Sequence, residues 1–274
     1  MPTLSSHQSD QITKMLLVGD SGTGKTGSLI SLVKQGYRLR IMDMDNGLDI
    51  LRNLVARECP DKMGNIEYET IRDKTVMSVI GPVIQGQPVA FTRAIGLLDK
   101  WSDGTRPADW GPEYVFVIDS LTHLSNAAMA WAAAFKVPTG KGGQQDGRAI
   151  YGEAQKAIEA VLAALTGEAF KSNVIVTAHI TYQQMSDGLL KGFPTSAGTA
   201  LGPKIPTYFN SIALCERVHG ALKPQLRTAP TALLDLKNPA SFDMQAVLPV
   251  DTGLADFFRT VRGPVAPTQT LKAS

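Results

Sequence analysis

The residues best able to do chemistry form a glycine-rich stretch near the start of the chain. This stretch matches the pattern GxxxxGK[ST] at each fixed position, with the residues Gly19, Asp20, Ser21, Gly22, Thr23, Gly24, Lys25 and Thr26. The glycines let consecutive backbone N–H groups point into one concavity that can hold phosphate oxygens. Lys25 would neutralise the β- and γ-phosphates, and the Thr26 hydroxyl would be a ligand of Mg²⁺. The motif predicts a site for ATP and Mg²⁺.

A second motif lies at residues 114–119, where the apolar run 114–118 is followed directly by Asp119. An aspartate at the carboxyl end of a parallel strand beside a phosphate-binding loop can hold Mg²⁺ together with Thr26. The next residue is Ser120, whereas helicases and AAA+ machines usually carry their catalytic glutamate there. The group that activates water must therefore come from another part of the chain.

The candidate for this group follows the second apolar run. Residues 41–49 read IMDMDNGLD and contain Asp43 and Asp45. Either carboxylate is a candidate for the group that activates water. Side chains two positions apart on a strand share a face, so both carboxylates could approach the phosphates. The alternative is that these acids only cap the helix that follows.

His179 stands directly after another apolar run at residues 174–178 and is a candidate catalytic residue. A single histidine at a strand end is more often structural, so its position alone leaves both possibilities open. The glycine-rich segment 181–206 follows and shows no apolar periodicity, which predicts a long functional or solvated loop. It carries a sparse set of cationic and aromatic side chains, namely Lys191, Phe193 and Lys204.

Another glycine-rich loop is expected at residues 136–148. Its charged side chains are mostly cationic, namely Lys136, Lys141 and Arg148 against Asp146. We expect both loops to lie at one edge of the sheet. A solvated connection without a ligand remains the alternative for each.

The elements that must position these residues alternate along the chain. Strands are expected at 15–18, 37–42, 66–71, 114–118 and 174–178, and helices at 24–34, 47–58, 89–101 and 154–165. Strands that are apolar throughout indicate a parallel sheet covered on both faces, so the fold class is α/β. Residues 211–215 and 231–236 are expected to add antiparallel strands at the sheet edge. One domain should span 14–262, between a flexible arm at 1–13 and a disordered tail at 263–274.

Composition narrows the class of protein further. The formal net charge of +2 excludes a polybasic protein, so any contact with nucleic acid must use a local patch. Cys59 and Cys215 show neither disulfide nor zinc spacing. No apolar run is long enough to span a membrane, and residues 1–14 do not resemble a secretory signal. We expect a protein of the cytoplasm with no membrane partner.

The order of these motifs resembles the RecA-like recombinase ATPases. The resemblance covers roughly residues 14–250 and rests on the phosphate loop, on an acidic strand end followed by a Leu-Asp helix start, and on Ile118-Asp119-Ser120-Leu121. The small size and the LKNPASF segment are most similar to phage-encoded members used in single-strand annealing and recombination. The resemblance implies a RecA-like P-loop core acting on single-stranded DNA in the cytoplasm of a bacterial host.

The resemblance also implies roles for single residues. The position of Asp45 is a glutamate in that family and polarises the attacking water; the shorter aspartate implies slow hydrolysis. His179 would sense the γ-phosphate and relay its presence to two loops that grip single-stranded DNA. Lys237 would reach the nucleotide of a neighbouring subunit in a ring or filament. Pro239 stands where an arginine is usual, so Arg217 and Arg227 remain alternatives, and so does a surface lysine without a functional role.

Two other functions stay open. A P-loop switch or regulator would bind nucleotide without contacting DNA directly. A DNA motor or helicase-type ATPase should carry an acid directly after Asp119, which this chain lacks. A small-molecule kinase is disfavoured because no arginine-rich lid segment is recognisable.

Overall fold

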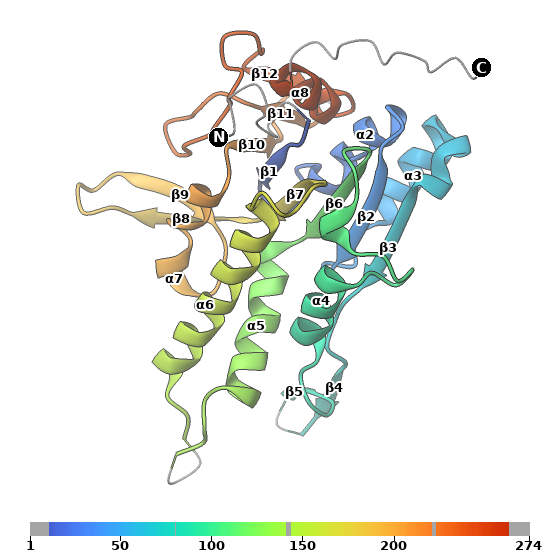
Figure 1. Cartoon of the computed structure of the whole chain (residues 1–274). Helices are drawn as coiled ribbons and strands as arrows, with labels where there is room; N and C mark the ends of the chain where they lie inside the picture. Colours follow the sequence, from blue (N-terminus) through green and yellow to red (C-terminus); the bar gives the residue numbers. More distant parts are fainter. Residues whose placement is uncertain (1–10, 80, 141–143, 221–222, 263–274) are drawn as a thin grey trace, which may run out of the picture.

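The computed structural model describes residues 11–79, 81–140, 144–220 and 223–262. It is built around one large sheet of eight strands (Figure 1). The strand order across this sheet is β12-β11-β10-β1-β7-β6-β2-β3. The strands are β1 (Lys14–Val18), β2 (Arg38–Asp43), β3 (Ile66–Thr70), β6 (Tyr114–Asp119), β7 (Asn173–Ala178), β10 (Ser211–Glu216), β11 (Gln225–Arg227) and β12 (Val247–Pro249).

The core of the sheet is parallel, because each strand from β10 to β3 runs in the same direction as its neighbours. Only β11 and β12 are antiparallel, at the C-terminal edge. Residues 211–215 were expected to be antiparallel, but β10 pairs parallel to β1, with Met15 opposite Ser211. The predicted α/β class, with added strands at the C-terminal end, is confirmed.

Helices cover both faces of the sheet. The longer ones are α3 (Asp49–Glu58), α4 (Ala90–Asp99), α5 (Leu121–Phe135), α6 (Gly147–Thr166) and α8 (Gly253–Arg262). The shorter ones are α1 (Lys25–Ser28), α2 (Ile30–Lys34), α7 (Gly198–Leu201) and the 3-10 turns η3 (Pro60–Asn65), η4 (Pro107–Asp109) and η5 (Ile205–Tyr208). Among the described residues, no helix combines the length and the apolar character that crossing a membrane requires.

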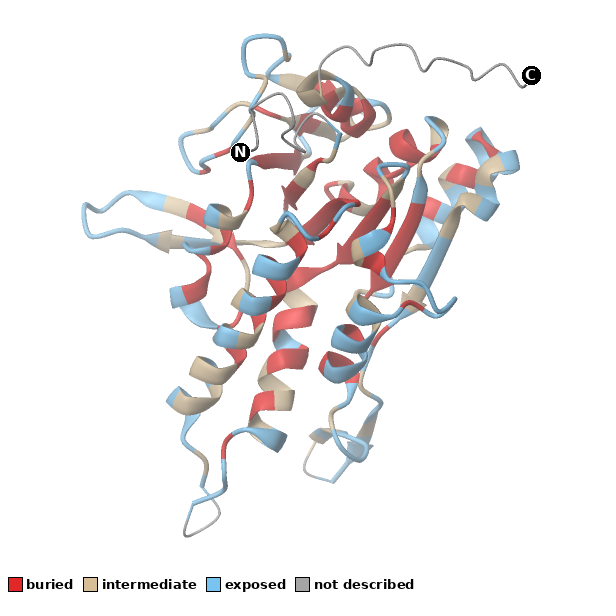
Figure 2. Cartoon of the chain, in the orientation of Figure 1, coloured by how far each residue is buried: buried red, intermediate tan, exposed pale blue. Residues whose placement is uncertain are grey.

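The alternation of side chains between the two faces of the sheet explains why the strands are apolar throughout. In β1, Leu16 and Val18 pack into the core beneath α4, α5 and α6, whereas Met15 and Leu17 pack into the core shared with α2, α3 and α8. Successive side chains of a strand point to opposite faces, so a sheet covered on both faces needs apolar residues at every position. The buried strands form the centre of the molecule in Figure 2.

The segment 181–206 is not the structureless loop that was expected. It begins with an antiparallel hairpin of β8 (Ile180–Gln184) and β9 (Leu190–Pro194), continues into α7 and ends at η5. Gly188 takes a left-handed φ of 82° in the turn, which glycine adopts without a Cβ clash. The hairpin projects from the body of the molecule, whereas the described ends of the loop 136–148 lie at the far ends of α5 and α6 (Figure 1). The two loops are therefore not neighbours.

Residues 231–236 form no strand, contrary to the expectation. The Thr231 hydroxyl accepts hydrogen bonds from the backbone N–H groups of Leu233 and Leu234, which bends the segment into a local turn. Only Lys237 pairs with the sheet, through an antiparallel bridge to Ile212. A second small hairpin, β4 (Thr75–Ser78) with β5 (Gly81–Ile84), was not predicted.

The ends of the expected domain differ in how much of them is described. Residues 1–10 of the expected arm, and the expected tail at 263–274, lie outside the described residues. Thr13 belongs to the packed structure, because it is buried and its N–H donates to Asn173 Oδ1 at 2.9 Å. Thr13, the last residue of the predicted arm, is thus packed against the body of the protein. At the other end, Arg262 donates to the Tyr37 hydroxyl at 2.8 Å.

Candidate nucleotide-binding site

The phosphate-binding loop joins β1 to α1 as the sequence predicted. Gly22 and Gly24 take left-handed φ angles of 74° and 94°, which residues with a Cβ rarely adopt. A Cβ at Gly19 would lie 2.4 Å from the carbonyl oxygen of Cys215, so this glycine permits the close approach of β10. The loop conformation thus requires glycine at all three positions.

Lys25 lies at the start of α1 and is only 6% exposed. Its ammonium donates to the carbonyl oxygens of Gly19 at 2.8 Å and Asp20 at 2.9 Å, and it lies 3.4 Å from His179 Nδ1. Burial lowers the pKa of Lys25, although the Asp119 carboxylate acts in the opposite direction. A cation held this way at the floor of the cavity is available to phosphate oxygens.

Thr26 and Asp119 form the candidate magnesium site. The Thr26 hydroxyl donates to Asp119 Oδ2 at 2.6 Å, and the Thr177 hydroxyl donates to Asp119 Oδ1 at 2.5 Å. Burial raises the pKa of Asp119, against the effect of both hydrogen bonds. A hydroxyl and a carboxylate at one point are the oxygen ligands that Mg²⁺ prefers. These residues fit the ion expected from the sequence.

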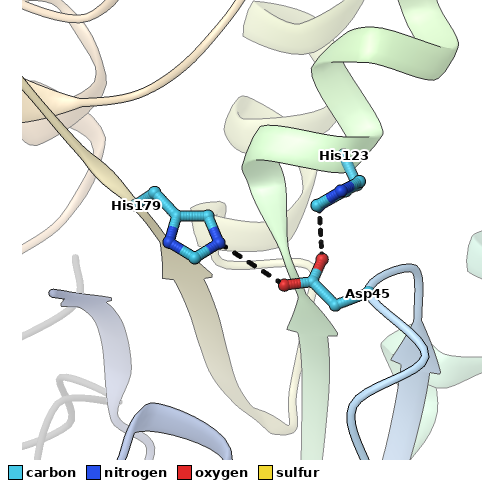
Figure 3. Close-up of side chains that lie close together, drawn as sticks. All are labelled: Asp45, His123 and His179. Atoms are coloured by element: carbon cyan, nitrogen blue, oxygen red, sulfur yellow. Dashed lines mark ion pairs between the residues drawn. The ribbon is translucent and has the colours of Figure 1, made fainter. Parts of the chain in front are cut away.

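Asp45 lies in the turn that follows β2 and is tied to the end of β6. The backbone N–H groups of Met44 and Asp45 both donate to the carbonyl oxygen of Asp119, at 2.6 and 3.2 Å. The Asp45 carboxylate accepts a hydrogen bond from the Ser120 hydroxyl at 2.8 Å and lies 2.5 Å from His123 Nδ1. Its other oxygen lies 3.6 Å from His179 Nε2 (Figure 3). The carboxylate thus faces the phosphate-binding loop across the cavity.

The charge state of this group follows from its partners. Burial by itself raises the pKa of Asp45, but the hydrogen bonds from His123 and Ser120 outweigh it and hold the pKa below its usual value. The pKa of His123 is raised, chiefly by its hydrogen bond to Asp45. Burial lowers the pKa of His179, and the nearby ammonium of Lys25 lowers it further. At neutral pH, Asp45 is therefore an ionised carboxylate.

Asp43 does not share this environment. It is 2% exposed, and its carboxylate accepts hydrogen bonds from the Gly47 N–H at 3.2 Å and the Thr70 hydroxyl at 3.4 Å. Because β2 ends at Asp43, strand alternation no longer applies to Asp45, and the two carboxylates diverge. Asp43 instead stabilises the turn that carries Asp45.

His123 was missed by the sequence analysis. It lies in the first turn of α5, four residues after Asp119, and its ring approaches that of His179 with centroids 6.5 Å apart. Its position could have identified it, because a helix that starts directly after Asp119 keeps its first turn beside the site expected for the phosphates. The alanine-rich helix itself was also not predicted.

These side chains line one cavity of about 720 Å³. This volume lies within the range of about 300–1,000 Å³ that is usual for small-ligand sites. Beyond the phosphate-binding loop, its walls come from the start of α5, from α3 and from the segments next to β11 and β12. The wall residues include His123, His179, Ile50, Leu54, Arg57, Arg217, Lys223, Pro224 and Val250. The predicted residues Lys25, Thr26, Asp45, Asp119 and His179 are thus brought together.

The candidates for a contact between subunits lie in different surroundings. The Lys237 ammonium donates to the carbonyl oxygens of Pro206 at 2.6 Å and Phe209 at 3.1 Å, outside the cavity. Arg227 pairs with Glu216 at 2.7 Å. Arg217 is exposed and lines the cavity of its own chain. The role of Lys237 in a neighbouring subunit stays a prediction.

The two lysines of segment 181–206 that were expected to bind nucleic acid are already paired within the chain, whereas Lys141 of the other expected loop lies outside the described residues. Lys191 forms an ion pair with Asp235 at 2.9 Å, and Lys204 forms one with Glu159 at 3.0 Å. Phe193 is half-buried on β9. Each of these ion pairs joins segments that are far apart in the sequence, so the sequence analysis could not anticipate them.

Comparison with known proteins places the chain in a family. Residues 12–238 match the family described as an AAA domain. The chain belongs to this family. With its phosphate-binding loop it is a P-loop ATPase. No sequence among the curated proteins matches it.

Many solved structures resemble the chain, and two of them show how distant the likeness is. The RadB recombinase is 14% identical, with a TM-score of 0.45, and the match covers 81% of this chain and 84% of that chain. An ATPase from the type III secretion system of pathogenic bacteria is 14% identical, with a TM-score of 0.39 over 76% of this chain. This chain spans 54% of the length of the secretion ATPase.

Proposed function

We propose that this P-loop ATPase hydrolyses Mg²⁺-ATP with Asp45 as the group that activates water, and that it acts on single-stranded DNA. The observation that carries the hydrolytic part is the position of the Asp45 carboxylate in the same cavity as Lys25, Thr26 and Asp119. A general base must reach the attacking water in its ionised form, and the partners of Asp45 keep it ionised. Turnover should be slow because aspartate is one methylene shorter than glutamate.

The chemistry divides among the residues of the cavity. The backbone N–H groups of the phosphate-binding loop and Lys25 would bind the triphosphate, and Thr26 with Asp119 would hold Mg²⁺, which supplies charge neutralisation when bound. Ser120 and His123 orient the Asp45 carboxylate, so that it accepts a proton from water in line with the γ-phosphate. Fixed hydrogen bonds of this kind avoid reorganisation during the reaction.

His179 supports a link between this chemistry and the β8–β9 hairpin. Its ring lies between Lys25 and Asp45, and its backbone leads directly into β8. Its carbonyl oxygen accepts the N–H of Thr195, the residue that follows β9, at 2.8 Å. Both ends of the hairpin therefore meet at His179, and a shift of this residue on γ-phosphate binding would move the hairpin base.

The hairpin carries side chains suited to an unpaired strand. Tyr182 and Leu189 are exposed, and Lys191 lies on the same hairpin. Aromatic stacking and cationic contacts to phosphates are the usual means of binding single strands without sequence preference. We propose that the hairpin contacts single-stranded DNA during annealing or recombination of the phage type, in a ring or filament of this chain.

Binding of labelled single-stranded DNA to filters, with and without a non-hydrolysable ATP analogue, tests this proposal. We expect retention that rises with the analogue and falls steeply with salt. Absence of retention in either state, with ATP hydrolysis intact, would refute the DNA part. Light scattering under the same conditions would detect the ring or filament.

One observation favours a second candidate, a nucleotide switch without direct DNA binding. Lys191 and Lys204 are both neutralised by ion pairs within the chain, with Asp235 and Glu159. Cations already paired offer less to a phosphate backbone. The filter experiment separates the two functions, because a switch would bind and release nucleotide without retaining DNA.

A further inference from the structure

Three metal-ligating side chains from separate parts of the chain converge in the cavity (Figure 3). Asp45 comes from the turn after β2, His123 from α5 and His179 from the junction of β7 and β8. One ligand atom from each lies within 4.8 Å of the other two. This group is distinct from the Thr26–Asp119 pair, which offers only oxygen.

The chemistry of the donors defines the ion that would fit. Two imidazoles and one carboxylate favour Zn²⁺ and neighbouring transition metals, whereas Mg²⁺ prefers oxygen ligands. Bonds of about 2.0–2.2 Å to a tetrahedral ion place its donors roughly 3.3 Å apart. The 3.6 Å between His179 Nε2 and Asp45 Oδ2 is close to this spacing. The 2.5 Å between His123 Nδ1 and Asp45 Oδ1 requires only a small opening.

The site is also accessible. The side chains of His123 and His179 are 39% and 27% exposed, and both line the open nucleotide cavity. An ion could therefore enter from solvent, and its remaining coordination positions could be filled by water. Three protein ligands with an open position distinguish such a site from structural zinc sites, which have four protein ligands.

We propose that Asp45, His123 and His179 form a second cation site, which takes a divalent transition metal of the Zn²⁺ class and stops ATP hydrolysis when occupied. Binding of the ion rests only on the geometry of the three side chains. Inhibition rests on the proposed function, because coordination to a divalent cation withdraws charge from the carboxylate and makes it a much weaker base.

Lys25 disfavours binding of the metal ion to the cavity without nucleotide. An ammonium has no acceptor, so its 3.4 Å contact with His179 Nδ1 requires that nitrogen to accept and leaves the ring proton on Nε2. Nε2 is the atom that the metal needs. Metal binding must therefore transfer the proton to Nδ1 and displace the Lys25 ammonium. Removal of Lys25 should tighten metal binding, although Lys25 is not a ligand.

The test uses the full chain without nucleotide and Zn²⁺ in competition with a chromophoric chelator. We expect one tightly bound Zn²⁺ per chain. His123→Gln and His179→Gln should each weaken it by more than about 100-fold, the upper end of the effect of losing an outer partner. Lys25→Ala should strengthen it several-fold. The control is His219→Gln, which alters an exposed histidine that does not line this cavity and should leave binding unchanged.

Circular dichroism of each variant establishes that it is folded. Histidine ring signals in NMR give an independent readout, because Zn²⁺ should shift those of His123 and His179 but not that of His219. The site is refuted if Zn²⁺ does not bind, or if it binds equally to folded His123→Gln and His179→Gln. If the site binds Zn²⁺ and the loaded protein still hydrolyses ATP, the inhibitory role is refuted. Asp45→Asn then tests the proposed function separately, because only undiminished turnover in that variant would remove Asp45 as the base.

Discussion

The nucleotide cavity and the β8–β9 hairpin are built in different ways. In the cavity, Asp45 and Asp119 each have two or more polar partners at the ends of buried strands. On and beside the hairpin, Lys191 and Lys204 each have one carboxylate partner at the surface. Exposed ion pairs of this type contribute about 0–1 kcal/mol. The cavity is thus arranged before its ligand arrives, whereas the lysines could exchange their partners for phosphates at little cost.

This contrast predicts the largest effect at Asp45. Asp45→Asn should keep ATP affinity and lose about 10²- to 10⁴-fold in turnover, because an amide cannot accept the proton of water. Steady-state hydrolysis and equilibrium binding of labelled ATP measure the two quantities. Asp43→Asn is the matched control and should retain most turnover, since Asp43 faces Gly47 and Thr70. The opposite pattern would exchange the two roles.

Lys25→Ala should reduce turnover by about 10²- to 10³-fold, the usual effect of removing one group that stabilises developing charge. It should also weaken ATP binding, because the same ammonium neutralises ground-state phosphates. A melting curve must accompany the assay, since Lys25 is buried and bonds to two carbonyl oxygens. Undiminished turnover in a folded variant would remove Lys25 from the reaction.

Effects at the surface lysines should appear only in DNA binding. Replacing Lys191 and Lys204 together by alanine should flatten the dependence of log affinity on log salt by about 1.4, because each lysine that binds a phosphate of a single strand adds about 0.7 to that slope. ATP hydrolysis without DNA should be unchanged. Lys156→Ala is the control, because Lys156 also forms a surface ion pair, with Glu153 on α6. An equal change in the salt dependence of Lys156→Ala would show that the effect comes from net charge and not from phosphate contacts of Lys191 and Lys204.

The smallest effect concerns the His123–Asp45 pair. Asp45→Asn should lower the pKa of His123 toward its usual value of about 6.5, because the imidazolium then lacks its carboxylate partner. Since folding raises this pKa, the pair contributes stability that is complete below about pH 6.5 while Asp45 stays ionised, and that is lost as pH rises through the raised pKa of His123. An NMR titration, assigned with His123→Gln, measures it. An unchanged pKa of His123 in Asp45→Asn would show that the Asp45 carboxylate does not raise it.

The sequence was most informative where local pattern and backbone geometry coincide. The phosphate-binding loop was predictable because Gly22 and Gly24 occupy conformations that only glycine adopts readily. The apolar strands were predictable because helices cover both faces of the sheet. Asp119 and His179 line the cavity because each stands at the end of a neighbouring parallel strand, a position that the sequence indicated.

The features that the sequence did not indicate depend on tertiary contacts. Strand alternation could not separate Asp43 from Asp45, because the chain turns between them. His123 was missed because α5 is rich in alanine and lacks a clear polar stripe. The ion pairs of Lys191 and Lys204 join residues 44 and 45 positions apart, which no local pattern records.

The central claim is that the nucleotide cavity and the hairpin are coupled through His179. Two titrations test it most directly: the affinity for single-stranded DNA with and without a non-hydrolysable ATP analogue, and the affinity for the analogue with and without DNA. Linkage requires the same factor in both directions. We predict such a factor in the wild type and its loss in His179→Ala, with both ligands still bound. Equal affinities in all wild-type titrations, or coupling that survives in His179→Ala, would contradict the claim.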